Sequence, residues 1–175
     1  MTGVQTCALP ICPEYREILE SLRKDGITKA LLIGMGGSSL APEVLALTFA
    51  GADGLRLTII DSTDPGQVLD ADQAHPLSET VYIVSSKSGG TAEIRALMDY
   101  FYAKAKAELG DDAGKHFIAI TDPGTLLERT AAELRFRNIV ISDPSIGGRF
   151  SVLSPFGILQ VRRSEERRVG KECRS

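Results

Sequence analysis

Cysteine is nearly absent from this sequence of 175 residues. Its three cysteines, Cys7, Cys12 and Cys173, lie near the ends, so residues 13–170 cannot form a disulfide framework or a cysteine-based metal site. Long apolar runs are absent too, because no stretch approaches the roughly 20 residues that a membrane span needs. The opening residues also lack the basic stretch and apolar core of a secretory signal. We therefore expect a cytoplasmic protein that has no membrane partner and no metal.

Most of the chain has no excess of positive charge. Residues 1–161 carry 14 basic and 20 acidic side chains, a net charge of −6, whereas residues 162–175 carry a net charge of +3. A domain this acidic is a poor match for nucleic acid, whose backbone is bound mainly by cationic side chains. The composition, with 43% hydrophobic and 25% charged residues, is ordinary for one globular domain and excludes disorder.

The two ends of the chain differ in character from the rest. Residues 1–12 and 162–175 resemble translated sequencing-adapter sequence, and neither end has an apolar face that could dock on a core. A solvated basic helix or a nucleic-acid tail is the alternative for the C-terminal run. We expect both ends to be non-native tails and residues 13–161 to form the folded domain.

Strand-like and helical segments alternate through residues 13–161. Short continuous apolar runs, typical of buried parallel strands, are separated by stretches with helical periodicity. Asp-Pro pairs at 64–65 and 122–123 provide helix starts. This alternation predicts an α/β fold, with a five-stranded parallel sheet, helices on both faces and the flavodoxin-like strand order 2-1-3-4-5. The expected strands are 29–33, 56–60, 80–84, 116–120 and 137–141, and the clearest expected helices are 14–24 and 91–109.

Two turns rich in serine and glycine follow the first and third expected strands. They are residues 34–39 (Gly-Met-Gly-Gly-Ser-Ser) and 85–91 (Ser-Ser-Lys-Ser-Gly-Gly-Thr), and both lead into helices. In this strand order, ligands bind where the order reverses, between the first and third strands. Helix N-termini and hydroxyls donate to phosphate oxygens, and Lys87 adds a positive charge. Serine and glycine also cap helices and form ordinary turns, but two such turns at the switch point favour a phosphate site.

A dinucleotide is the main rival to a small phosphate ester. Gly34 and Gly36 match the Gly-x-Gly-x-x-Gly fingerprint, but Ser39 occupies its third glycine position. Asp61 is placed where an acid would bind a ribose, although an acid there also caps turns. The ATP-binding pattern fails because no glycine stands four residues before a Gly-Lys-Ser/Thr. A small phosphate ester, bound without a nucleotide cofactor, therefore fits better.

Three motifs together resemble the glucose-6-phosphate isomerase family. They are residues 34–42 (Gly-Met-Gly-Gly-Ser-Ser-Leu-Ala-Pro), residues 86–91 (Ser-Lys-Ser-Gly-Gly-Thr) with Glu93, and residues 147–151 (Gly-Gly-Arg-Phe-Ser). The first motif is most similar to the branch fused behind a transaldolase domain. The resemblance implies the first of two sugar isomerase domains in an enzyme that interconverts glucose 6-phosphate and fructose 6-phosphate. It also implies a hexose phosphate ligand and a parent protein that is a homodimer or a transaldolase fusion.

The same resemblance assigns roles to single residues. Gly37 and Ser38 are expected to line the sugar-phosphate pocket. Arg149 matches the arginine that stabilises the negative charge developing on the enediolate, a role for which a fixed cation is chemically suited. A surface salt bridge is the alternative for Arg149. The expected phosphate loop comprises Ser86, Lys87, Ser88 and Thr91.

The sequence also departs from the family. Gly89 and Gly90 stand where many members have bulky and hydroxyl residues, which predicts a more flexible loop and a shifted sugar preference. The family's catalytic glutamate, ring-opening histidine and late lysine belong to segments after the third motif. We expect His75 to lie at the surface and His116 to begin a strand, so neither replaces them. The chain alone is therefore expected to bind sugar phosphate weakly and not to turn it over.

A phosphosugar sensor without catalysis is the alternative function. Regulators of this kind generally carry a DNA-binding helix-turn-helix before the sugar isomerase domain. The Gly-Gly-Arg-Phe-Ser motif at 147–151 is not expected in them. This motif therefore favours the enzyme.

Overall fold

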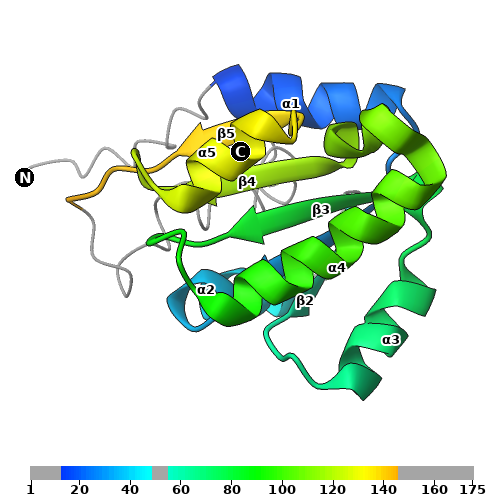
Figure 1. The fold of residues 1–175 in the computed structure, drawn as a ribbon, viewed down its shortest axis with the longest axis horizontal. Coiled ribbons are helices and arrows are strands. Elements are labelled where there is room, and N and C mark those ends of the chain that lie inside the picture. The colour runs from blue at the N-terminus through cyan, green and yellow to red at the C-terminus, as the bar shows by residue number, and fades with distance from the viewer. Residues whose placement is uncertain (1–12, 49–54, 146–175) are drawn as a thin grey trace, which may run out of the picture.

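The computed structural model describes residues 13–48 and 55–145, and the predicted tails at 1–12 and 162–175 lie outside them. Five parallel strands form one sheet in the order β2-β1-β3-β4-β5 (Figure 1). The strands are β1 (Lys29–Gly34), β2 (Arg56–Ile60), β3 (Thr80–Ser85), β4 (Phe117–Thr121) and β5 (Asn138–Ile141). The predicted fold class and strand order are confirmed, and each strand agrees with its expected range to within one residue at each end.

Within the described residues, α1 precedes the first strand, and four further α-helices and two short 3₁₀-helices lie between the strands. None of them, within the ranges that the structure describes, combines the length and apolarity needed to cross a membrane. The α-helices are α1 (Pro13–Lys24), α2 (Gly37–Thr48), α3 (Pro65–Ala74), α4 (Ala92–Leu109) and α5 (Leu126–Glu133), and the 3₁₀-helices are η1 (Leu77–Glu79) and η2 (Gly110–His116).

The two faces of the sheet carry separate apolar clusters, because successive side chains of a strand point to opposite faces. On one face, Ile18 and Leu22 of α1 pack against alternate side chains of β1, β3 and β4. On the other face, the Tyr82 ring stacks between Phe101 of α4 and Phe117 of β4, with ring centroids 5.1 and 4.9 Å apart. Figure 1 shows α4 crossing this face in front of β3. Helices therefore cover both faces, as predicted.

Of the two Asp-Pro pairs, only the first starts a helix. Asp64 caps α3 as predicted, since its carboxylate accepts a hydrogen bond of 3.0 Å from the N–H of Gln67. The prediction for the second pair is wrong, because α5 begins at Leu126 and its N-cap is Thr125. Gly124, with φ of +75°, turns the chain after the Asp122–Pro123 pair, and the Thr125 hydroxyl then caps the helix. Asp122 is left free for another contact.

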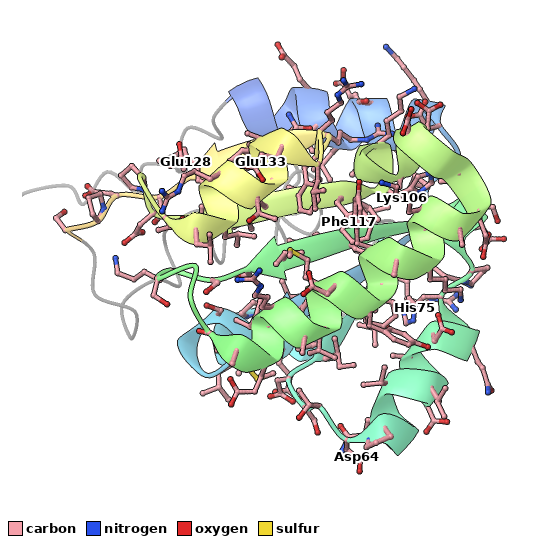
Figure 2. The ribbon with its side chains drawn as sticks, viewed as in Figure 1. Asp64, His75, Lys106, Phe117, Glu128 and Glu133 are labelled. Atoms are coloured by element: carbon pink, nitrogen blue, oxygen red, sulfur yellow. The ribbon has the colours of Figure 1, made fainter. Side chains whose placement is uncertain are left out.

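Both histidines lie within hydrogen-bond distance of a backbone carbonyl, and the expected surface position of His75 is wrong. His75 is only 3% exposed at the end of α3, where Nδ1 lies 2.7 Å from the carbonyl oxygen of Ala71 (Figure 2). The Tyr82 hydroxyl lies 3.5 Å from the carbonyl oxygen of His75, so His75 also contacts β3. His116 ends η2, just before β4, and its Nδ1 lies 3.0 Å from the carbonyl oxygen of Thr80.

Candidate functional site

The two serine- and glycine-rich turns lie side by side at the carboxyl edge of the sheet. β1 and β3 are direct neighbours, and their last residues, Gly34 and Ser85, pair with each other. The turns that follow them lead into the N-termini of α2 and α4. The strand order reverses at this point, so the predicted site falls on the switch point of the sheet.

The first turn is held by its own hydrogen bonds. Gly36 has φ of +60°, and α2 begins at the exposed Gly37. Ser38 is half-buried and its N–H donates to the Met35 carbonyl at 3.3 Å. Ser39 is buried, and its hydroxyl donates to the Gly36 carbonyl at 2.9 Å. Ser39 therefore shapes the turn, whereas Gly37 and Ser38 lie at the start of the helix, where an anion would bind.

The second turn presents two serines of different character. Ser86 is buried, and its Oγ accepts a hydrogen bond of 3.1 Å from the N–H of Gly89. Ser88 is exposed, and its Oγ lies 3.4 Å from the N–H of Gly90. Thr91 occupies the N-cap position of α4 without capping it through its side chain. The first N–H groups of this helix of 18 residues are therefore not capped by Thr91.

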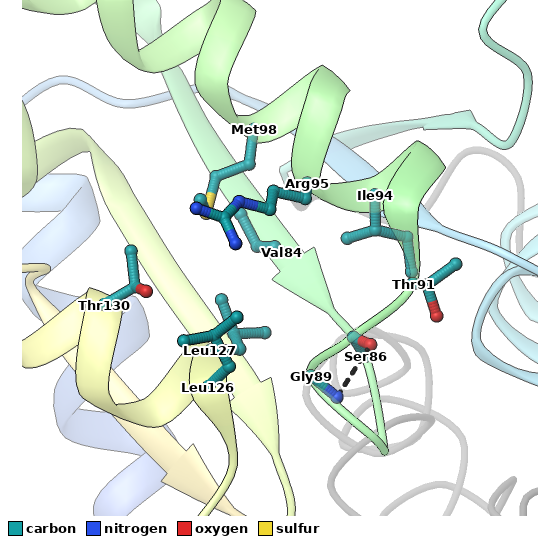
Figure 3. A pocket seen from close by; sticks show the side chains of 10 residues that line it. All are labelled: Val84, Ser86, Gly89, Thr91, Ile94, Arg95, Met98, Leu126, Leu127 and Thr130. Atoms are coloured by element: carbon teal, nitrogen blue, oxygen red, sulfur yellow. Dashed lines mark hydrogen bonds between the residues drawn. The ribbon is translucent and has the colours of Figure 1, made fainter.

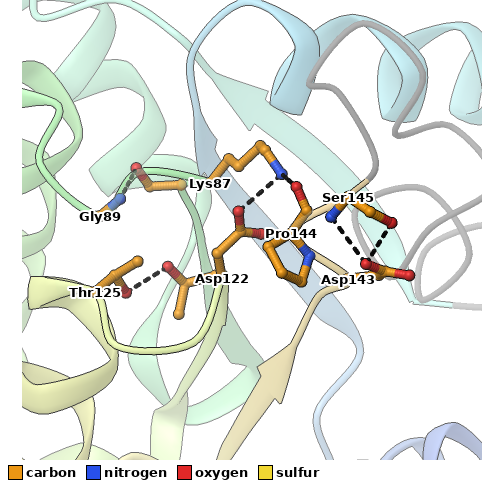
Figure 4. Close-up of polar contacts among 9 residues, drawn as sticks. Lys87, Gly89, Asp122, Thr125, Asp143, Pro144 and Ser145 are labelled. Atoms are coloured by element: carbon orange, nitrogen blue, oxygen red, sulfur yellow. Dashed lines mark hydrogen bonds and ion pairs between the residues drawn. The ribbon is translucent and has the colours of Figure 1, made fainter.

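Lys87 is directed toward the ends of β4 and β5. Its ammonium lies 2.8 Å from a carboxylate oxygen of Asp122 and donates to the Pro144 carbonyl at 3.2 Å (Figure 4). Sequence reasoning missed Asp122 because it treated the Asp-Pro pair only as a helix start. A signal was present, since Lys87 and Asp122 follow the neighbouring strands β3 and β4 and so belong to the same edge of the sheet.

A second acidic residue, Asp143, lies at the same edge of the sheet, two positions after the end of β5. The hydroxyl and the N–H of Ser145 donate to Asp143 Oδ1 at 2.7 and 2.9 Å. These bonds, together with the charge of Lys87, lower the pKa of the exposed Asp143 carboxyl. The Asp122 carboxylate, in direct contact with the Lys87 ammonium, compensates its charge.

Gly89 packs tightly against the turn between β4 and α5. It has φ of +67°, and a Cβ on it would lie 2.7 Å from the Cβ of Thr125 and 2.9 Å from the backbone nitrogen of Leu127. Gly90, by contrast, has open space where a Cβ would stand. The first glycine of the pair thus permits a close approach, and the predicted flexibility of the loop stays a prediction.

A pocket opens beside the second turn, between α4 and α5 (Figure 3). Together with its open mouth it encloses about 290 Å³. Its floor is apolar, and hydroxyls and the Arg95 guanidinium stand among the lining groups. Because it shares three residues with the turn, it is continuous with the predicted phosphate site. The lining residues are Val84, Ser86, Gly89, Thr91, Ile94, Arg95, Met98, Leu126, Leu127 and Thr130.

Three buried polar atoms at this edge have no hydrogen-bond partner within the described part of the chain. They follow or end three neighbouring strands and are Ser85 Oγ, Asp122 Oδ1 and Ser142 Oγ. Native structures leave few such atoms, and they often bind water or ligand groups. Over the same residues, 13–48 and 55–145, no group of three or more His, Cys, Asp or Glu side chains is placed to bind a metal.

The structure thus places six of the seven predicted site residues on two neighbouring turns. Arg149, the seventh, lies with the rest of its motif outside the described residues. Glu93 is exposed in the first turn of α4, where a carboxylate complements the helix dipole. The six residues are Gly37, Ser38, Ser86, Lys87, Ser88 and Thr91.

Comparisons with known proteins agree on one family. A family model described as phosphoglucose isomerase matches residues 20–164. The glucose-6-phosphate isomerase of Thermus thermophilus is 34% identical to this chain over 154 residues, and that of a Synechococcus species is 40% identical over 139 residues. A crystal structure of a glucose-6-phosphate isomerase from Chlamydia trachomatis is 28% identical, with a TM-score of 0.72.

The matches cover most of this chain but a minor part of each relative. They include 85% of this chain and 37% of the Thermus protein, and 75% of this chain and 25% of the Synechococcus protein. The Chlamydia structure is matched over 85% of this chain and 29% of its own length. The chain therefore spans between a quarter and two fifths of the length of these relatives.

Proposed function

The chain belongs to the phosphoglucose isomerase family, and we propose that it supplies the phosphate-binding domain of an enzyme that interconverts glucose 6-phosphate and fructose 6-phosphate. The observation that carries this proposal is the pairing of Gly34 with Ser85, which brings two hydroxyl-lined helix starts to one point of the sheet. Such a point offers backbone N–H groups, hydroxyls and two positive helix ends to one anion.

The phosphate of the sugar is the group that this domain would hold. In the proposal, the N–H groups at the starts of α2 and α4 donate to phosphate oxygens, and the hydroxyls of Ser38, Ser88 and Thr91 complete the set. Fixing the phosphate positions carbons 1 and 2 of the opened sugar for the reaction. No metal or nucleotide takes part in this scheme.

The chemistry would move a proton between carbon 2 and carbon 1 through an enediolate. Arg149 would stabilise the negative oxygen that forms in this intermediate, since a fixed cation there binds the transition state more strongly than the ground state. The family resemblance assigns the glutamate that carries the proton to a later segment. The span of 25–37% of the relatives' lengths is consistent with a catalytic set that is incomplete in this chain.

Partners and location follow from the same resemblance as further proposals. We propose that the parent protein acts in the cytoplasm on free hexose phosphates. We also propose that the parent protein is a homodimer or is fused to a transaldolase domain.

Calorimetric titration of this chain with glucose 6-phosphate tests the proposal. We expect saturable binding of glucose 6-phosphate and fructose 6-phosphate, weaker binding of inorganic phosphate, and no binding of glucose or NAD. Binding of NAD in place of hexose phosphates would overturn the proposal.

An isomerisation assay then separates the enzyme from the sensor alternative. We expect this chain alone to show no turnover, and the parent protein to interconvert the two hexose phosphates. A parent protein that binds both sugars without converting them would favour the sensor.

A further inference from the structure

Lys87 stands in the predicted phosphate loop, but its ammonium is engaged elsewhere. We propose that Lys87 and Asp122 form a positioning pair, which fixes the shape of the loop, and that the Lys87 ammonium is not itself a phosphate ligand. This inference rests on the proposed function, because it concerns how that same site is held ready for its anion.

The contacts of the ammonium support this assignment. Nζ lies 2.8 Å from a carboxylate oxygen of Asp122 and 3.2 Å from the carbonyl oxygen of Pro144. An ammonium has three donors, so two of them are already used. The two side chains are 31% and 15% exposed, so the pair is partly withdrawn from water. Breaking such a pair would leave a charge without compensation, which is costly.

The same two residues are joined a second time through the backbone. The N–H of Asp122 donates to the Lys87 carbonyl at 3.3 Å, and the N–H of Ser86 donates to the Ile120 carbonyl at 3.0 Å. The loop is thus fastened to the end of β4 by backbone and side chain together. Ser86, Lys87 and Gly89 all contact the β4 end or the turn after it.

Charge around Lys87 argues against a direct role in anion binding. The Asp122 carboxylate contacts the ammonium at 2.8 Å, and the charge of Lys87 also contributes to lowering the pKa of Asp143. A phosphate approaching the ammonium would therefore meet the carboxylate of Asp122, which has its own sign. The N–H groups and hydroxyls of residues 86–91 carry no such penalty, and they are the groups whose placement the pair would control.

Affinity for glucose 6-phosphate separates the two roles of Lys87. If the pair positions the loop, Lys87→Met and Asp122→Asn each weaken binding about ten-fold, and the double variant is little weaker than either, because both remove one interaction. Lys87→Arg, which keeps a cation within reach of Asp122, retains most of the affinity. If the ammonium binds phosphate directly, Asp122→Asn removes a competing carboxylate and tightens binding, and that result would overturn the proposal.

Hydrogen exchange of the unliganded chain provides a readout that does not depend on binding. We expect the amides of Ser86, Gly89 and Asp122 to exchange about ten-fold faster in Lys87→Met and in Asp122→Asn, while amides in the middle of β1 keep their rates. Unchanged exchange at the loop would contradict the positioning role. If the unaltered chain binds no hexose phosphate, the proposed function fails. The exchange rates still show whether Lys87 and Asp122 position the loop.

An exposed lysine–aspartate pair serves as the matched control. Lys115 lies 2.8 Å from Asp112 in η2, and both side chains are 64% exposed. Lys115→Met removes the same charge from the chain without touching the loop. It is expected to leave both the affinity and the loop exchange unchanged, since exposed pairs contribute little. Equal effects of Lys115→Met and Lys87→Met would mean that net charge alone is responsible, and would overturn the proposal.

Discussion

Gly89 approaches Thr125 so closely that a Cβ atom on the glycine would lie 2.7 Å from the Cβ of the threonine. Thr125 caps α5 through its hydroxyl, which also lies 2.8 Å from the hydroxyl of Thr121 at the end of β4. The predicted phosphate loop therefore rests on the start of α5. The shape of the loop depends on the turn beside it as much as on its own sequence.

Substituting the two glycines of the loop should have opposite outcomes. Gly89→Ala combines a left-handed backbone, which costs a non-glycine residue about 1–2 kcal/mol, with a clash at Thr125. We expect it to lower the unfolding free energy by about 1–3 kcal/mol and to weaken hexose phosphate binding. Gly90→Ala, which meets open space, should leave stability within about 0.5 kcal/mol. Urea unfolding and titration compare the two, and equal effects would contradict the packing of Gly89.

Substituting the two serines of the loop should affect different properties, stability for Ser86 and phosphate binding for Ser88. Ser86→Ala leaves the N–H of Gly89 without its acceptor, so we expect a loss of about 1 kcal/mol in unfolding free energy. Ser88→Ala, on an exposed hydroxyl, should leave stability unchanged but weaken phosphate binding. Thermal unfolding and calorimetry on both variants give the comparison. Unaltered affinity of Ser88→Ala would show that this hydroxyl does not bind the phosphate.

The turn after β1 also contains two serines, Ser38 and Ser39, whose substitutions should differ in the same way. Ser39→Ala removes the bond of its buried hydroxyl to the Gly36 carbonyl and should lower the unfolding free energy by about 1 kcal/mol. Ser38→Ala should instead weaken glucose 6-phosphate binding with little change in stability. Unfolding and binding measured on the same samples distinguish these outcomes. The reverse pattern would place Ser39, and not Ser38, against the ligand.

Strands and topology could be predicted because the central strands are buried on both faces. Every residue of β3 and β4 is buried, and such strands appear in sequence as continuous apolar runs. The Asp64–Pro65 pair likewise determines the start of α3 locally, since the cap and the helix are adjacent in the chain. Local patterns of this kind need no tertiary information.

Contacts between distant segments could not be predicted in the same way. Lys87 and Asp122 are 35 positions apart, and their contact depends on the direction that the lysine side chain takes in the fold. A position before Pro76, in a loop after an expected helix, predicts His75 at the surface. Its burial depends on α3 folding back on the sheet. The missed contact of Asp122 and the wrong position of His75 both concern side chains whose surroundings come from other elements.

Stability at alkaline pH should report on Tyr82. This tyrosine is 1% exposed between two phenylalanine rings, and burial raises the pKa of its phenol far above the ordinary value near 10. The folded state therefore retains the proton when the unfolded state has lost it. The contribution to stability is complete below about pH 10 and is lost as the pH rises above that value, by up to about 1.4 kcal/mol per pH unit.

Urea unfolding between about pH 8 and pH 11 measures this loss. Tyr82→Phe removes the ionising group and should flatten the alkaline fall in unfolding free energy. Losing the weak bond from the Tyr82 hydroxyl to the His75 carbonyl, at 3.5 Å, should cost little stability at neutral pH. Tyr100→Phe is the matched control, because Tyr100 is 40% exposed and its phenol is accessible to water. An alkaline slope that persists in Tyr82→Phe, or that disappears in Tyr100→Phe, would assign the loss of stability to another group.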